Sequence, residues 1–98
     1  MNIKPTIGRV VWFKPDPENV FDKVMSRGDQ MMAADVCYVW SDQMVNLSVK
    51  DMDGIPFGIT SVPLHQGDPE SCPPGSCCWM PYQKQQAQKD QQAETAEA

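Results

Sequence analysis

Hydrophobic and polar side chains alternate along two stretches in the middle of the chain. The run Met44–Asp51, MVNLSVKD, sets valine and leucine against asparagine, serine and lysine at every second position. The run Met31–Trp40 shows the same period. A period of two is typical of a β-strand with one buried face. In the earlier run it predicts one shared face that holds Ala34, Val36, Tyr38 and Trp40.

Three further segments are rich in β-branched and aromatic residues and are bounded by proline or glycine. They are Gly8–Pro15, Phe57–Leu64 and Cys77–Tyr82. Pro81 has no backbone donor, which predicts that the last strand lies at an edge or an end of the sheet. Asp53 and Gly54 predict a turn before the fourth strand.

The remaining segments have loop compositions. In Asp16–Gln30 a few apolar residues recur at helical spacing, which predicts one or two helical turns inside a long loop. His65–Ser76 is dominated by glycine, proline, aspartate and serine and predicts a loop. Residues 84–98 carry no large apolar side chain, so they predict a disordered tail with at most transient helix.

Five short strands within residues 1–83 predict one domain of the mainly β class. A chain of 98 residues supports a single modest core. The number of strands favours a small five-stranded antiparallel SH3-like barrel over a sandwich, which needs about seven strands. An OB-like barrel is the nearest alternative.

Charge and hydropathy exclude several classes of protein. The net charge is −5 and the eight lysine and arginine residues are scattered, so no basic stripe is available for nucleic acid. No apolar run reaches the roughly 20 residues that cross a bilayer, and the N-terminus lacks the apolar stretch of a signal peptide. We therefore expect a cytoplasmic protein with mostly reduced cysteines.

Four cysteines and one histidine raise the question of thiol or metal chemistry. A zinc site normally needs two tightly spaced ligand pairs, which the spacing of Cys72, Cys77, Cys78 and His65 does not provide. A disulfide between Cys72 and Cys77 is possible in oxidised protein. A cysteine hydrolase would need an oriented histidine. The favoured interpretation makes Cys37 and one of the adjacent pair small buried residues and the others exposed thiols, with no metal, cofactor or catalytic residue.

Aromatic residues provide the best candidates for binding. Most of the seven rings on or beside the predicted strands are expected to fill the core, and the positions of Trp12 and Trp40 suit burial. Trp79 and Tyr82, near the end of the last strand, are expected to be exposed. The predicted partner-binding residues are Trp79, Tyr82 and Trp40.

Four motifs follow one another along the chain: KPTIGRVVWF, YVWSDQMVNLSVKDMDG, TSVPL and, from Cys77 to Gln83, CxWMPYQ. In their order and spacing they resemble a family of short uncharacterised proteins of tailed bacteriophages and prophages. The resemblance covers most of residues 4–83 and implies a phage origin and a compact β fold, without catalytic residues. Relatives tend to carry a charged residue where this chain has Cys78.

The sequence thus predicts a phage-encoded, non-enzymatic accessory protein that binds a host or phage protein. It would act in the host cytoplasm, as a virion or assembly component or as a decoy for a host factor, and as a monomer or small homo-oligomer. An alternative from another class is an oligomer that sequesters a small nucleotide-like ligand in evasion of host defence, with Arg9, Ser48 and Lys50 as its candidate residues. A metal or thiol enzyme is the third hypothesis.

Overall fold

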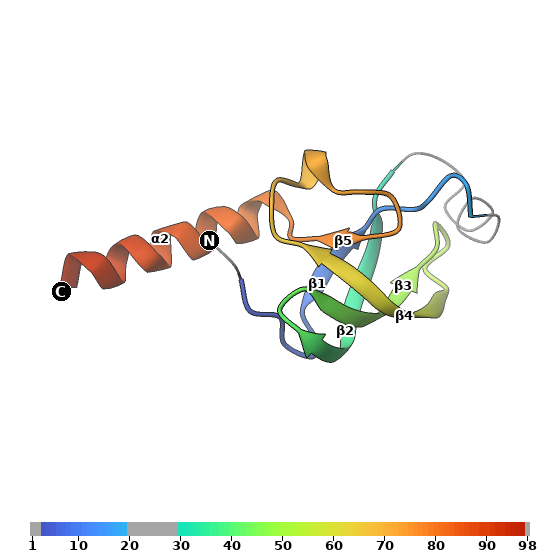
Figure 1. Ribbon diagram of the computed structural model, residues 1–98, viewed down its shortest axis with the longest axis horizontal. Helices are drawn as coiled ribbons and strands as arrows, with labels where there is room; N and C mark the ends of the chain where they lie inside the picture. Colours follow the sequence, from blue (N-terminus) through green and yellow to red (C-terminus); the bar gives the residue numbers. More distant parts are fainter. Residues whose placement is uncertain (1–2, 20–29, 98) are drawn as a thin grey trace.

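The computed structural model describes residues 3–19 and 30–97 (Figure 1). The helical turns expected between residues 20 and 25 lie outside this part of the chain. Five strands are followed by a helix, and a short 3-10 turn, η1, precedes the last strand. The elements are β1 (Val10–Phe13), β2 (Met32–Ser41), β3 (Met44–Lys50), β4 (Pro56–His65), η1 (Pro69–Ser71), β5 (Cys77–Cys78) and α2 (Pro81–Glu97).

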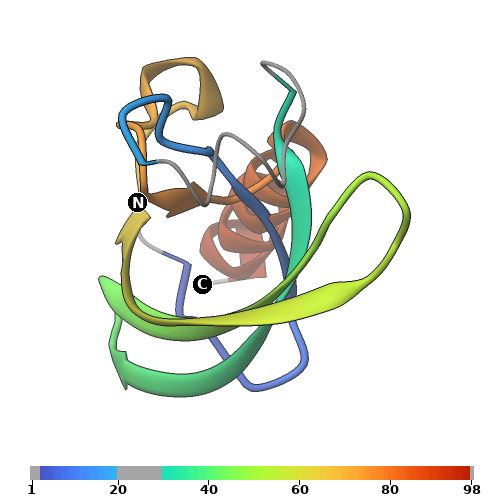
Figure 2. The ribbon, with the colours of Figure 1, turned by 90° about the vertical axis from the view of Figure 1, so that its right-hand side faces the viewer.

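The strands form a closed barrel in the order β1-β2-β3-β4-β5, curving round a common axis (Figure 2). The prediction of a small five-stranded barrel is confirmed. Neighbouring strands are antiparallel except β4 and β5, which pair in parallel through Leu64 with Cys77 and His65 with Cys78. A parallel pair needs a crossover connection, and the segment between these strands, which contains η1, provides it.

Strand β5 has a neighbour on each side, so it is not an edge strand. Phe13 of β1 and Leu64 of β4 both pair with Cys77. The prediction of an edge position is therefore wrong. It rested on Pro81, but β5 ends at Cys78, before the proline is reached.

The core fills the inside of the barrel with aliphatic and aromatic side chains. The alternation read in β3 is confirmed, because its second, fourth and sixth residues are buried and the others are half-buried. Trp79 and Phe13 are the largest fully buried side chains. The other members are Ile3, Val11, Met32, Ala34, Val36, Val45, Leu47, Val49, Val62, Leu64 and Cys77.

Two β-bulges in β2 change which side chains face the core. Val36 pairs with Leu47, yet Tyr38 pairs with the next residue back along β3, Asn46. One extra residue on β2 reverses the facing of the residues that follow it, up to the second bulge between Val39 and Ser41. Ala34 and Val36 are buried as predicted, but Tyr38 and Trp40 are exposed. The predicted shared face is therefore wrong beyond Val36.

A third bulge lies opposite, on β4. Val45 pairs with Val62 and Leu47 with Ile59, so β4 carries an extra residue between them. Ser61 in this stretch has φ of 55°, in the left-handed region that non-glycine residues seldom adopt. Asn46, on the facing strand, stabilises this backbone because its Oδ1 accepts a hydrogen bond of 2.7 Å from Ser61 N.

The turn between β3 and β4 is organised by Asp51. Its Oδ1 accepts hydrogen bonds of 2.9 Å from the backbone nitrogens of Asp53 and Ile55, and Gly54 has φ of 81°. The carboxylate of Asp51 therefore serves the backbone of the turn, as predicted.

Helix α2 begins at Pro81, directly after the barrel, and extends away from it (Figure 1). Gln83 anchors its first turn: Oε1 accepts from Met80 N at 2.7 Å, and Nε2 donates to the carbonyl oxygen of Val10 at 2.9 Å. The backbone of Pro81–Glu97 is helical, and the disorder expected of the tail stays a prediction. Within the described residues, no helix has the length and apolar character required to cross a membrane.

Candidate functional site

Two adjacent aromatic rings of β2 lie on the outside of the barrel. Tyr38 is 48% exposed and Trp40 is 59% exposed. Their ring centroids are 4.7 Å apart and the rings meet edge to face at 65°. Exposed large aromatic side chains that pack on each other offer contact area with little conformational freedom left to lose. We call Tyr38 and Trp40 the aromatic pair.

The side chain of Asn46 fixes the orientation of the aromatic pair. Its Oδ1 accepts a hydrogen bond of 2.9 Å from Trp40 Nε1, together with the bond from Ser61 N. One amide oxygen therefore links β2, β3 and β4 at the positions where the strands bulge. Because the indole is already bonded, its ring is held in one orientation before any partner arrives.

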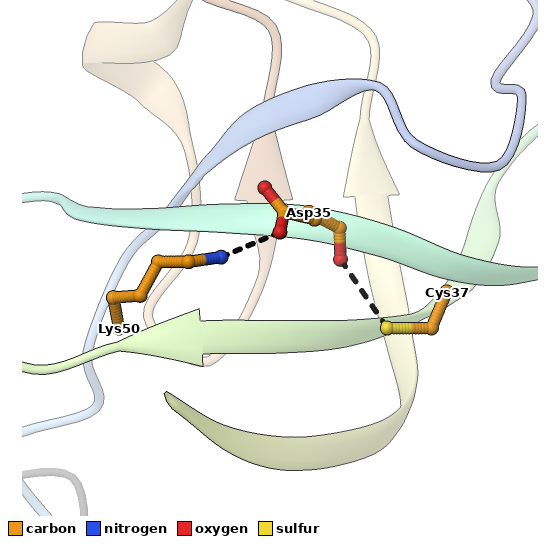
Figure 3. A network of polar contacts seen from close by, with 3 residues as sticks. All are labelled: Asp35, Cys37 and Lys50. Atoms are coloured by element: carbon orange, nitrogen blue, oxygen red, sulfur yellow. Dashed lines mark hydrogen bonds and ion pairs between the residues drawn. The ribbon is translucent and has the colours of Figure 1, made fainter. Parts of the chain in front are cut away.

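An ion pair occupies the same two strands nearer the start of β2. Lys50 Nζ lies 2.5 Å from Asp35 Oδ2, and the exposed thiol of Cys37 donates to the carbonyl oxygen of Asp35 at 3.7 Å (Figure 3). Arg9, the other cation of the nucleotide-binding alternative, lies over the ring of Trp79 at 5.4 Å from the centroid. Both cations are thus engaged within the chain.

Trp79 is fully buried, at 0% exposure, so the prediction that it is exposed is wrong. Trp79 directly follows β5, which lies between β1 and β4 in the closed barrel. At this position its indole belongs to the core cluster. Its Nε1 donates a hydrogen bond of 3.1 Å to Gln66 Oε1. A side chain in this position cannot touch a partner directly.

Tyr82 is 66% exposed, as expected, but it lies in α2 and not on a strand. It lines a small pocket with Arg9 and Gln83. The end of β2 and the start of α2 lie at different parts of the barrel in both ribbon views. The structure therefore does not join Tyr82 and Trp40 into one patch, and the expected burial of Trp40 is wrong.

An open groove of about 530 Å³ lies at one end of the barrel. His65 borders it, and its Nε2 lies 3.0 Å from Ser71 Oγ. Among the described residues, no three histidine, cysteine or acidic side chains are grouped as metal ligands. The groove is lined by Ser41, Gln43, Met44, Pro63, Leu64, His65, Gln66, Pro73 and Ser76.

The sequence interpretation of the cysteines is wrong for Cys37 and Cys72, and it is right that the adjacent pair supplies a buried residue. Cys37 is exposed because it is the extra residue of a bulge, whereas Cys72, Cys77 and Cys78 are buried. Cys77 faces the core and its thiol lies 3.5 Å from the carbonyl oxygen of Pro63. The thiol of Cys78 is hydrogen-bonded to that of Cys72, outside the core cluster. All four cysteines are free.

Cys77 should make the stability of the protein depend on alkaline pH. Burial, and then the neighbouring Cys72, raise the pKa of the Cys77 thiol to about 12. In an unfolded chain a thiol titrates near about 8.5. The contribution of the Cys77 thiol to the free energy of unfolding is thus complete below the pKa of the unfolded chain. As the pH rises from that pKa towards the folded pKa, the contribution falls by up to about 1.4 kcal/mol per pH unit.

The test compares the wild type with Cys77→Ala by urea unfolding at about pH 9 and about pH 10. The free energies of unfolding of the two proteins should differ less at the higher pH than at the lower one. The reduction should be about 1.4 kcal/mol, the effect of one proton over one pH unit. A difference that stays constant over this range would contradict the assignment.

Comparisons with protein-family models, curated proteins and solved structures gave no match to the chain. The candidate site therefore rests on the geometry of the chain. Sequence reasoning missed Tyr38 and Asn46, which complete the site around Trp40. The one available signal was the asparagine at the first polar position of β3, on the strand face opposite the core.

Proposed function

We propose that this protein is a small, non-enzymatic protein-binding module whose contact surface is centred on the aromatic pair. The observation that carries the proposal is the hydrogen bond from Trp40 to Asn46, which holds two exposed rings in a fixed arrangement. Interface hot spots are enriched in tryptophan and tyrosine, and a rigid surface loses less entropy on binding.

The partner segment that suits this surface is basic. The chain has a net charge of −5, and the exposed Asp42 follows Trp40 by two residues at the end of β2. An arginine or lysine side chain could lie over the indole face, where the attraction is about 0.5–2 kcal/mol, and be neutralised by the aspartate. Electrostatic complementarity of this kind also accelerates association.

The resemblance to bacteriophage proteins supports a phage origin. The proposed partner is then a host or phage protein that the module meets in the host cytoplasm. A virion or assembly component and a decoy for a host factor are both consistent with a compact, acidic module.

Removal of the aromatic pair is the direct test. We expect Tyr38→Ala with Trp40→Ala to weaken partner binding by at least about 30-fold, the equivalent of about 2 kcal/mol for a hot spot. Binding would be measured by quantitative mass spectrometry of proteins retained from bacterial extract, with and without infection. Tyr82→Ala is the matched control, because its ring is equally exposed but lies elsewhere, and it should retain binding.

Two further results would test the proposal, in addition to the loss of binding in the double variant. Asn46→Ala, which leaves both rings in place but frees the indole, should weaken binding several-fold. If the double variant retains the same partners at wild-type levels while Tyr82→Ala loses them, the contact surface lies at the pocket beside α2 and the proposal for β2 is wrong.

A further inference from the structure

The crossover between β4 and β5 brings two thiols together. Cys72 follows η1, at the base of this loop, and Cys78 lies in β5. Their side chains are hydrogen-bonded to each other, and both are buried. Cys78 is on the outer side of β5 because Cys77, its neighbour, points into the core.

The loop around Cys72 borders the open groove. Its thiol lies 3.6 Å from the carbonyl oxygen of Ser76 and 3.7 Å from that of Pro73. Both of these residues line the open groove at the end of the barrel. The buried thiol therefore lies against residues that border open space, and a local opening of this loop would admit a small oxidant.

We propose that Cys72 and Cys78 are an oxidisable dithiol that closes to a disulfide in the presence of a peroxide, while Cys77 and Cys37 remain thiols. This differs from the pairing of Cys72 with Cys77 that the sequence spacing favours. In the structure Cys77 faces the core, whereas the thiol of Cys72 is hydrogen-bonded to Cys78.

The two thiols are electronically unequal, which assigns the order of events. The hydrogen bond from Cys78, followed by the nearby positive charge of Lys14, lowers the pKa of Cys72 against the effect of burial. The same hydrogen bond and burial raise the pKa of Cys78. The thiolate is the nucleophile, so Cys72 reacts first.

The chemistry balances with hydrogen peroxide as the oxidant. The Cys72 thiolate attacks one peroxide oxygen, the O–O bond breaks, and the departing hydroxide takes up a proton to form water. The resulting sulfenic acid on Cys72 is attacked by the sulfur of Cys78. An S–S bond forms, the C–S–OH oxygen leaves with the Cys78 proton as a second water, and the two thiols have supplied two electrons to the peroxide.

Cys77 and Cys37 are unsuited to the second step. The thiol of Cys77 lies against the carbonyl oxygen of Pro63 and belongs to the core cluster, so it faces away from the pair. Cys37 lies on β2, on an exposed bulge beside Asp35. Neither side chain has a described contact with Cys72 that would favour it over Cys78.

The experiment uses the full chain, reduced and then treated with hydrogen peroxide, followed by alkylation and intact mass measurement. Trypsin leaves all three C-terminal cysteines in one peptide, because no lysine or arginine lies between Lys50 and Lys84, so the pairing must be assigned with variants. Wild type should lose two hydrogen atoms and two alkylatable thiols. A variant with both Cys37→Ser and Cys77→Ser, which retains only the proposed pair, should do the same.

The single variants complete the assignment, and circular dichroism confirms that each is folded before treatment. Cys72→Ser and Cys78→Ser should both fail to form the intramolecular disulfide. In Cys78→Ser the sulfenic acid has no resolving thiol, so dimedone should label Cys72. The proposal is overturned if folded Cys72→Ser or Cys78→Ser still forms a disulfide, if loss of Cys77 abolishes it, or if wild type keeps four alkylatable thiols.

Discussion

Replacement of Trp79 by alanine should lower the free energy of unfolding by about 3–5 kcal/mol, the usual cost of deleting a buried aromatic side chain. Its indole is fully buried, donates a hydrogen bond to Gln66, and lies beneath the guanidinium of Arg9. A domain of this size has a total stability of about 5–15 kcal/mol. The variant should therefore be at or near the limit of folding.

Urea unfolding followed by circular dichroism would measure the effect, and Trp40→Ala is the matched control. Both variants remove one indole, but Trp40 is mostly exposed, so its loss should cost less than about 1 kcal/mol. Equal destabilisation by the two variants would contradict the placement of Trp79 in the core.

Gln66→Ala should have the second largest effect, about 2–4 kcal/mol, because one side chain holds three segments together. Its Oε1 accepts from Ile3 N at 2.9 Å and from Trp79 Nε1 at 3.1 Å. Its Nε2 donates to the carbonyl oxygens of Ile3 and Asp42, each at 2.9 Å. Truncation leaves part-buried donors without partners, which costs more than a surface hydrogen bond contributes.

The same unfolding measurement would test this prediction, with Gln85→Ala as the control. Gln85 is exposed on α2, and alanine is the better helix former, so stability should be unchanged or slightly higher. Among described residues, no buried side-chain nitrogen or oxygen lacks a hydrogen-bond partner. A loss below about 0.5 kcal/mol for Gln66→Ala would mean that water replaces the amide at no cost.

The strands could be predicted from the sequence because their side chains alternate and their ends carry proline, glycine or aspartate. Met44–Lys50 is the clearest case, with boundaries and buried face both as expected. The alternation of side chains does not reveal bulges. An extra residue in a strand changes which side of the sheet the following side chains face, but it leaves no mark in the pattern of apolar residues. This is why the sequence placed Tyr38 and Trp40 on the wrong face of β2.

The candidate site was only partly predictable for the same reason. Trp40 was named as a binding residue, but the pairing with Tyr38 and the hydrogen bond to Asn46 depend on the register between β2 and β3. Trp79 was misplaced because sequence reasoning could not show that β5 pairs on one side with β4 and on the other with β1, which lies far from it along the chain. Long-range pairing of this kind leaves no local signal.

The closure of the barrel by a two-residue strand has a consequence for how the protein folds. β5 joins β1 through Trp12 with Cys78, a contact that spans most of the chain, and contacts of high sequence separation form slowly. Until residues 77 and 78 have been synthesised and docked, β1 and β4 each have an open edge, and such edges pair readily with other chains. We therefore expect chains truncated before β5 to aggregate, so that the last few residues of the barrel decide whether each newly made molecule stays monomeric long enough to fold.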